Sequence, residues 1–324
     1  MIWNLNPMPF LRRRPTLEVH VPVSPTPTFL NMAHYLTRSL RVRGGRYRDA
    51  PIVLTVGAEE RDPDLARNHP WMADNGVEVR WVDQEIFARE SWYATACERF
   101  RYEFKSDVML ALDADTLIAG PLDELVEEAH RTGALCGVVA HVPPLARREQ
   151  WQDIYDSCGL GELKTPCEHT GWGYMFQDES LRYCPPYFNL GVLAAPAAVM
   201  RSLGSAIYEL MAAVDAVERT MYRVQIAVSL AVTRSGLPFR ALPFRWNFVN
   251  DPLLEALHAS ELGDVRIIHL LRKHQLYKNE LYASLENVEA MLARTDLRVI
   301  NALAQRLLGE LHPRVKAEEA ARPV

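Results

Sequence analysis

The chain has 324 residues, of which 48% are hydrophobic and 24% charged, and its formal net charge is -5 at pH 7. This is an ordinary globular composition, with room for one large α/β domain or two small ones. The negative charge argues against a surface that coats nucleic acid. No uninterrupted apolar run approaches the ~20 residues of a membrane-spanning helix. Five cysteines, an odd number, favour free thiols in a reducing compartment.

Residues 1–15 are expected to form a flexible leader. Arg12, Arg13 and Arg14 follow its apolar residues instead of preceding them, which is not the order of a secretory signal. A leader of this kind leaves contact with a membrane surface open. We therefore predict a cytoplasmic protein that touches a membrane at most peripherally.

Short apolar runs that alternate with stretches of helical spacing predict an α/β fold. The first half of the chain has strands expected at 16–23, 51–56, 77–82, 108–112 and 133–142, with helices expected at 29–40 and 88–104. Connections of this kind predict a largely parallel sheet with helices on its faces. In such sheets the ligand lies at the carboxyl ends of the strands.

Two carboxylates stand at the end of the apolar run 108–112, at Asp113 and Asp115. Residues two apart on an extended segment point the same way, so the two side chains are expected to converge. Two buried carboxylates repel unless a cation lies between them or one is protonated. Hard oxygen ligands suit Mg²⁺ or Mn²⁺, which keep open positions for water or phosphate oxygens. The sequence therefore predicts a divalent-metal site here.

Residues 143–186 break the pattern and form an irregular segment rich in Trp, Tyr, Cys and Gly. So long an irregular segment inside a domain is usually functional. Its aromatic residues could stack on a sugar or simply cover the sheet edge. Cys158, Cys167 and Cys184, with His169 nearby, lack the paired spacing of a zinc site and read better as ordinary thiols.

The remaining chain completes the predicted domain. Strands are expected at 187–193, 239–243 and 265–269, helices at 196–213, 221–233, 281–293 and 297–311, and a disordered tail at 313–324. We predict one α/β domain over 16–278, a mostly parallel mixed sheet with helices on both faces, followed by a C-terminal helical extension at 279–312.

Taken in order, five motifs resemble the GT-A fold of nucleotide-sugar glycosyltransferases, most closely the glycogenin and lipopolysaccharide galactosyltransferase family. They are Asp-Ala-Asp at 113–115, Phe-Asn-Leu-Gly-Val at 188–192, Gln225 on a helix, Leu-Pro at 242–243 followed by Asn247, and the late His269. The likeness covers roughly residues 16–277. It implies a metal-dependent transfer of sugar from a nucleotide-diphosphate sugar, with a UDP-sugar favoured, to an acceptor that the sequence does not identify.

The resemblance implies roles for particular residues. Asp113, Asp115 and His269 would hold Mn²⁺ or Mg²⁺ against the diphosphate, since imidazole also suits Mn²⁺. Three basic residues would contact the phosphates or sugar: Arg99, Arg272 and Lys273. Two polar residues, Asn189 and Gln225, would lie near the donor sugar.

Two positions depart from the family pattern. Val224 stands where an acidic residue usually precedes the glutamine, which leaves the stereochemical outcome undecided. In the motif that begins at His269, Arg272 replaces a glycine and Gln275 replaces a lysine, which weakens the expected phosphate-binding loop.

Two other readings remain open from the sequence. A glycosyltransferase-like scaffold could bind a sugar nucleotide without turnover, although two paired aspartates would then be a needless cost. A haloacid-dehalogenase-like phosphatase also uses Asp-x-Asp, with the first aspartate as nucleophile. That class needs Thr or Val where Leu117 stands, and normally places the motif on its first strand.

Overall fold

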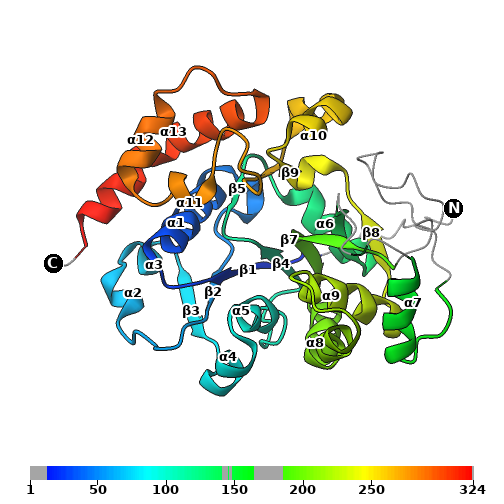
Figure 1. Cartoon of the computed structure of the whole chain (residues 1–324). Helices are drawn as coiled ribbons and strands as arrows, with labels where there is room; N and C mark the ends of the chain where they lie inside the picture. Colours follow the sequence, from blue (N-terminus) through cyan, green and yellow to red (C-terminus); the bar gives the residue numbers. More distant parts are fainter. Residues whose placement is uncertain (1–12, 141–144, 146–147, 164–184, 323–324) are drawn as a thin grey trace, which may run out of the picture.

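The computed structural model describes residues 13–140, 145, 148–163 and 185–322. In these residues the chain folds around a seven-stranded mixed sheet with helices on both faces (Figure 1). The order across the sheet is β3-β2-β1-β4-β7-β6-β8. Its strands are β1 Leu17–Val23, β2 Ile52–Val56, β3 Val77–Trp81, β4 Val108–Leu112, β6 Leu135–Val139, β7 Phe188–Pro196 and β8 Phe239–Ala241.

The sheet is mainly parallel. β3, β2, β1 and β4 run parallel to one another, and β6 runs parallel to β8. β7 lies antiparallel between β4 and β6. The predicted α/β class with a mostly parallel mixed sheet is therefore confirmed.

β4 is continuously apolar because both of its faces are buried. Leu110 and Leu112 pack into one core, while Met109 and Ala111 pack into a second core on the other face. Alternation of side chains along a strand gives this division. β4 is therefore a central strand whose carboxyl end is held firmly from both sides.

Helices close each face (Figure 1). The first core is covered by α1 Pro27–Arg43, α6 Asp123–Thr132, α12 Leu285–Leu292 and α13 Val299–Ala320. The second is covered by α5 Trp92–Glu98, α7 Arg148–Ser157, α8 Ala197–Val217 and α9 Arg223–Arg234. Shorter helices are α2 Leu65–Asn68, α3 Trp71–Asp74, α4 Gln84–Glu90, α10 Pro252–Leu257 and α11 Lys278–Leu281, with 3-10 turns at Gly45–Tyr47, Phe244–Trp246 and Ala259–Asp264.

A small second sheet has the order β5-β10-β9 and consists of β5 Thr116–Ile118, β9 Phe248–Val249 and β10 Ile267–His269. β5 follows β4 after a three-residue turn, in which the amide of Thr116 donates to the carbonyl of Asp113 at 3.1 Å. β10 pairs antiparallel with β5 and brings a late segment of the chain to the end of β4. This sheet assembles the site described below.

Three expectations about helices need correction. The helix expected at 88–104 is two helices, α4 and α5, separated at Ser91. The segment 143–186 is not wholly irregular, because α7 lies within it and buries Trp151, Ile154 and Tyr155 in the second core. The other aromatic residues of that segment lie outside the described residues, as do Cys167, His169 and Cys184; these aromatic residues are Trp172, Tyr174, Phe176 and Tyr183.

The tail expected to be disordered from residue 313 is helical up to Ala320, because α13 continues through Pro313. Buried contacts outweigh the cost of the proline. Leu311 and Val315 pack in the first core, and the Tyr35 hydroxyl hydrogen-bonds Nδ1 of His312 at 2.5 Å. Helical propensity alone could not foresee this, since the partners lie on α1, far away in sequence.

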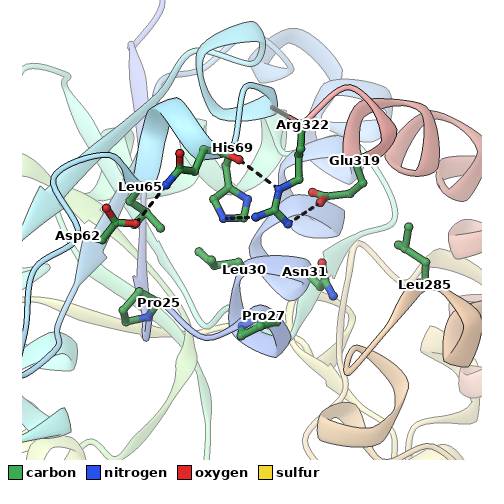
Figure 2. Close-up of a pocket in the computed structure, with 11 residues that line it drawn as sticks. Pro25, Pro27, Leu30, Asn31, Asp62, Leu65, His69, Leu285, Glu319 and Arg322 are labelled. Atoms are coloured by element: carbon green, nitrogen blue, oxygen red, sulfur yellow. Dashed lines mark hydrogen bonds and ion pairs between the residues drawn. The ribbon is translucent and has the colours of Figure 1, made fainter. Parts of the chain in front are cut away.

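The end of α13 is anchored by charged groups (Figure 2). Buried His34 faces Glu318 at 2.8 Å through Nε2 and Glu319 at 3.2 Å through Nδ1. Arg322 contacts Glu319 at 3.1 Å and His69 at 3.3 Å, beside a cavity of about 340 Å³ that these residues help to line. The helix is thus fastened to α1 and to the segment before α3.

This anchoring predicts a loss of stability in acid. Burial alone would raise the pKa of Glu318 and of Glu319, but His34 and neighbouring arginines outweigh it and hold each pKa below its ordinary 4.5. A carboxylate with a lowered folded pKa stabilises the fold above its ordinary pKa and loses that contribution as pH falls through the folded value. We expect the free energy of unfolding to drop less between about pH 5 and 3 in Glu318→Gln/Glu319→Gln than in wild type.

Urea unfolding at each pH measures this difference. The control is Glu59→Gln/Glu60→Gln, in an exposed loop, which should keep the wild-type pH dependence. Equal pH dependence in the Glu318/Glu319 variant and wild type would contradict the anchoring role.

α8 is, by length and composition alone, apolar enough to cross a membrane, and it is the one helix among the described residues that passes this test. Uninterrupted apolar runs do not reveal it, because polar residues are scattered along its sequence. Its buried residues, including Leu203, Ile207 and Leu210, pack in the second core. Such packing is typical of a core helix within a domain.

Candidate active site

A cavity of about 690 Å³ opens at the carboxyl ends of β1 and β4. Its charged and polar lining comes from α5, the turn after β4, the start of β7, α9, the end of β10 and the segment that follows. The sequence-predicted residues that line it are Arg99, Asp113, Asp115, Asn189, Gln225, His269 and Arg272. The sequence therefore points to residues that do come together, although they lie far apart along the chain.

Asp113 begins the turn after β4, and its side chain is 35% exposed to the cavity. Its backbone amide donates to the carbonyl of Gly191 on β7 at 3.0 Å, which fixes the turn against the sheet. Arg99 approaches from the end of α5 and contacts the Asp113 carboxylate at 3.1 Å. This guanidinium is 1% exposed and also donates to the carbonyls of Leu112 and Leu190. Arg99 is therefore a buried anchor of Asp113.

Asp115 is buried, and strand register places His269 beside it. In the antiparallel pairing of β5 and β10, His269 stands opposite Thr116. The amide of Leu270 then donates to the carbonyl of Asp115 at 3.0 Å. As a result Nε2 of His269 lies 3.3 Å from a carboxylate oxygen of Asp115.

The orientation of the His269 ring is set by a chain of two amides. The Gly191 amide, which can only donate, gives its hydrogen to Oδ1 of Asn189 at 2.8 Å. The same oxygen accepts from Nδ2 of Asn247 at 2.9 Å, so Oδ1 of Asn247 faces Nδ1 of His269, at 2.9 Å. Nδ1 must therefore carry a hydrogen, so the neutral form of the ring presents its lone pair at Nε2.

This tautomer fits a metal ligand. Nε2 of His269 is buried and has no hydrogen-bond partner among the described residues, although Asp115 is 3.3 Å away. A lone pair facing a carboxylate is repulsive unless a cation lies between them. Ligand atoms of Asp113, Asp115 and His269 all lie within 4.8 Å of one another. The donor set of two carboxylates and one imidazole suits Mn²⁺ or Mg²⁺.

Gly191 is required by the packing of this histidine. A Cβ atom added at Gly191 would lie 2.3 Å from Cε1 of His269 and 2.5 Å from Nδ1. Real Cβ contacts are essentially never so short, so any side chain at 191 would displace the ring. The glycine of the Phe-Asn-Leu-Gly-Val motif thus makes room for the imidazole.

Lys278 is a site residue that the sequence motifs did not predict. Its ammonium forms a short ion pair with the second carboxylate oxygen of Asp115, and it lines the cavity. Burial alone would raise the pKa of Asp115, but His269 when its ring is protonated, together with the Lys278 ammonium, outweighs burial and holds that pKa below its usual range. Burial alone would lower the pKa of Lys278, and Asp115 reverses this and raises it.

The sequence does contain the lysine that the family pattern expects after His269, but at a later position. The family pattern predicts a lysine at 275, where Gln275 stands, and a lysine occurs three positions later. Gln275 serves the fold instead, because it adopts φ 59° and its side chain bonds Asp296, Arg298 and Asn301 at the start of α13. Three more residues therefore separate His269 from its lysine than the family pattern predicts.

The two other basic residues predicted from the sequence, Arg272 and Lys273, differ in whether they line the cavity. Arg272 lines the cavity, with its Nε 3.4 Å from Asp251 and its backbone held by Asn250. Lys273 is not among the residues that line the cavity, and its ammonium lies 4.5 Å from the centre of the Tyr277 ring. Only Arg272 of this pair is thus placed at the site.

A family model for the Rhodobacterales glycosyltransferase domain matches residues 21–236, which is most of the chain. The chain belongs to this glycosyltransferase family. The match includes both aspartates, Asn189 and Gln225, whereas His269 and Lys278 lie beyond it. No curated protein sequence matches the chain.

Solved structures show the same fold for this glycosyltransferase. The chain resembles the bifunctional glycosyltransferase WbbM, with a TM-score of 0.52 and 12% identity, over 98% of this chain but only 53% of WbbM. It also resembles the galactosyltransferase LgtC, solved with donor and acceptor sugar analogs, with a TM-score of 0.50 and 16% identity, over 87% of this chain and 98% of LgtC. The predicted GT-A fold and the enzyme class are confirmed, and the phosphatase and non-enzymatic readings are set aside.

Proposed function

We propose that this glycosyltransferase transfers a sugar from a nucleotide-diphosphate sugar, a UDP-sugar by preference, in a reaction that depends on Mn²⁺ or Mg²⁺. The observation that carries the proposal is the cluster of Asp113, Asp115 and His269 in the wall of a cavity of about 690 Å³, where the buried Nε2 of His269 has no hydrogen-bond partner among the described residues. A cation held there would neutralise the charge that develops on the leaving diphosphate.

The surrounding basic residues fit a diphosphate. Arg272 and Lys278 line the same cavity. The buried Arg99 guanidinium holds the Asp113 carboxylate in place by a hydrogen bond. A divalent ion shared by the three ligands would compete with the Lys278 ammonium for Asp115. The displaced ammonium would then be free to bind phosphate oxygens, as a point charge with three donors.

The polar residues have separate roles. Gln225 lines the cavity from α9 and is proposed to contact the donor sugar. Asn189 also lines the cavity, but its carbonyl oxygen is already shared by Gly191 and Asn247. Its first role is therefore to position His269, and its amide nitrogen remains for the donor. Val224, buried beside Gln225, supplies no carboxylate, so we propose no nucleophilic residue at this position.

Thermal unfolding of the purified protein with nucleoside diphosphates and their sugars tests the proposal, each with Mn²⁺ and with EDTA. A ligand that binds only the folded state stabilises it by about 2.7 kcal/mol at a hundredfold excess over Kd. We expect UDP or a UDP-sugar to raise the midpoint with Mn²⁺, and EDTA to remove most of the rise. A nucleotide shift that is equal in Mn²⁺ and EDTA would contradict metal dependence. No shift with any nucleotide would contradict the donor class.

A further inference from the structure

Part of the cavity wall is aromatic and exposed, which the donor site as described does not explain. Trp92 at the start of α5 is 53% exposed, and Met221 and Tyr222, just before α9, are 67% and 38% exposed. Together with Tyr93 they line the same cavity as Asp113 and His269. We call these four residues, Trp92, Tyr93, Met221 and Tyr222, the aromatic rim. Large apolar side chains left in water at a cavity are typical of a binding surface.

Trp92 contacts a neighbour, Tyr93, that is itself held by Arg223. Its ring stacks on Tyr93 with ring centres 3.7 Å apart, and the guanidinium of Arg223 lies 4.0 Å from the centre of the Tyr93 ring. Arg223 is itself fixed by ion pairs with Asp215 and, at 3.3 Å, with Glu90. The exposed Trp92 ring thus rests on Tyr93, and Tyr93 contacts a fixed guanidinium, which limits the conformational entropy that Trp92 would lose when a ligand binds.

The backbone supports the same reading. Ser91 has φ 55° and ψ -143°, a region that residues other than glycine rarely adopt, and it separates α4 from α5. A continuous helix from 84 to 98 would have avoided this strain. Strained residues other than glycine occur preferentially at ligand sites. The break at Ser91 places Trp92 at the first position of α5, which packs against α9. Arg223, the first residue of α9, contacts the neighbouring Tyr93 ring.

We propose that the aromatic rim is the acceptor subsite and that it takes the pyranose ring of a saccharide, an inference that rests on the proposed donor site for its neighbour. A pyranose has an apolar face of C–H groups and an edge of hydroxyls. The Trp92 face matches the first. The hydroxyl of Tyr222, on the same rim, is at hand for the second. A lipid bilayer fits less well, because the rim shares its cavity with the charged residues of the donor site.

Saturation-transfer NMR with the full chain tests this subsite. The probes are lactose and the methyl α- and β-pyranosides of glucose, galactose and mannose, each with and without UDP and Mn²⁺. We expect transfer to the ring protons of at least one probe. Trp92→Ala should weaken that binding by about a few-fold to tenfold, the range for loss of one aromatic contact. Trp92→Phe should restore part of it. The control Val299→Ala removes an equally exposed apolar side chain on α13 and should change nothing.

The same samples separate this proposal from the donor site. The Mn²⁺-dependent thermal shift by UDP should be the same in Trp92→Ala and wild type, because the ring contact of Trp92 within the described part of the chain is with Tyr93 and not with Asp113, Asp115 or His269. Two outcomes overturn the acceptor subsite alone, both with a normal UDP shift. In the first, no saccharide binds; in the second, a saccharide binds equally well to Trp92→Ala and wild type. Trp92-dependent binding to phosphatidylglycerol vesicles, with no saccharide bound, also overturns it and assigns the rim to a membrane surface.

Discussion

Asp115→Asn is expected to abolish Mn²⁺ binding and with it the metal-dependent effect of UDP. Asp115 is buried between the lone pair of His269 and the Lys278 ammonium, so its carboxylate is the central ligand of the proposed site. Loss of an outer-shell partner costs roughly 10–100-fold in metal affinity, and we expect loss of this ligand to cost more. Titration of the purified protein with Mn²⁺, followed by EPR of the free ion, measures the affinity directly.

Lys278→Met is the matched control. Both variants break the same ion pair, and a broken buried pair costs up to about 3–5 kcal/mol, less here because Lys278 is a quarter exposed. Both proteins should therefore lose comparable stability, whereas only Asp115→Asn loses a metal ligand. We expect Lys278→Met to keep or tighten Mn²⁺ binding and to weaken UDP binding. Wild-type Mn²⁺ affinity in Asp115→Asn, or equal loss in both variants, would refute the assigned roles.

Gly191→Ala is expected to lower Mn²⁺ affinity by about 10–100-fold without touching any ligand atom. The added methyl group would collide with the His269 ring, at 2.3 Å from Cε1. The ring must turn, and it then loses either the Nδ1 bond to Asn247 or the approach of Nε2 to Asp115. The same EPR titration reports the change, and the far-UV circular dichroism should stay that of wild type.

Gly263→Ala makes the same chemical change where an added Cβ meets nothing within 4 Å. This variant should bind Mn²⁺ as wild type does. Unchanged Mn²⁺ affinity in Gly191→Ala would show that His269 does not hold the ion. A loss of affinity in both glycine variants would instead point to a general loss of stability.

The sequence by itself determined the fold class and half of the site. Buried strands such as β4 are marked by local apolar runs, and Asp113 and Asp115 follow directly in the same stretch. Local order also predicted that the motif ends a parallel strand, where α/β proteins bind ligands. These are properties of neighbouring residues, so a single sequence contains them. His269, Asn189 and Gln225 could be named only because their order resembles a known family.

Only the tertiary structure decided how these residues work. The pairing of β10 with β5 puts His269 on Asp115, and the bonds from Gly191 through Asn189 and Asn247 choose its tautomer. Arg99 lies in a stretch that the sequence predicts to be helical, and packing makes it a buried anchor of Asp113. Lys278 and the end of α13 escaped prediction for one physical reason. Their partners, Asp115 and His34, are distant in sequence, and long-range contacts outweigh both motif spacing and a proline in a helix.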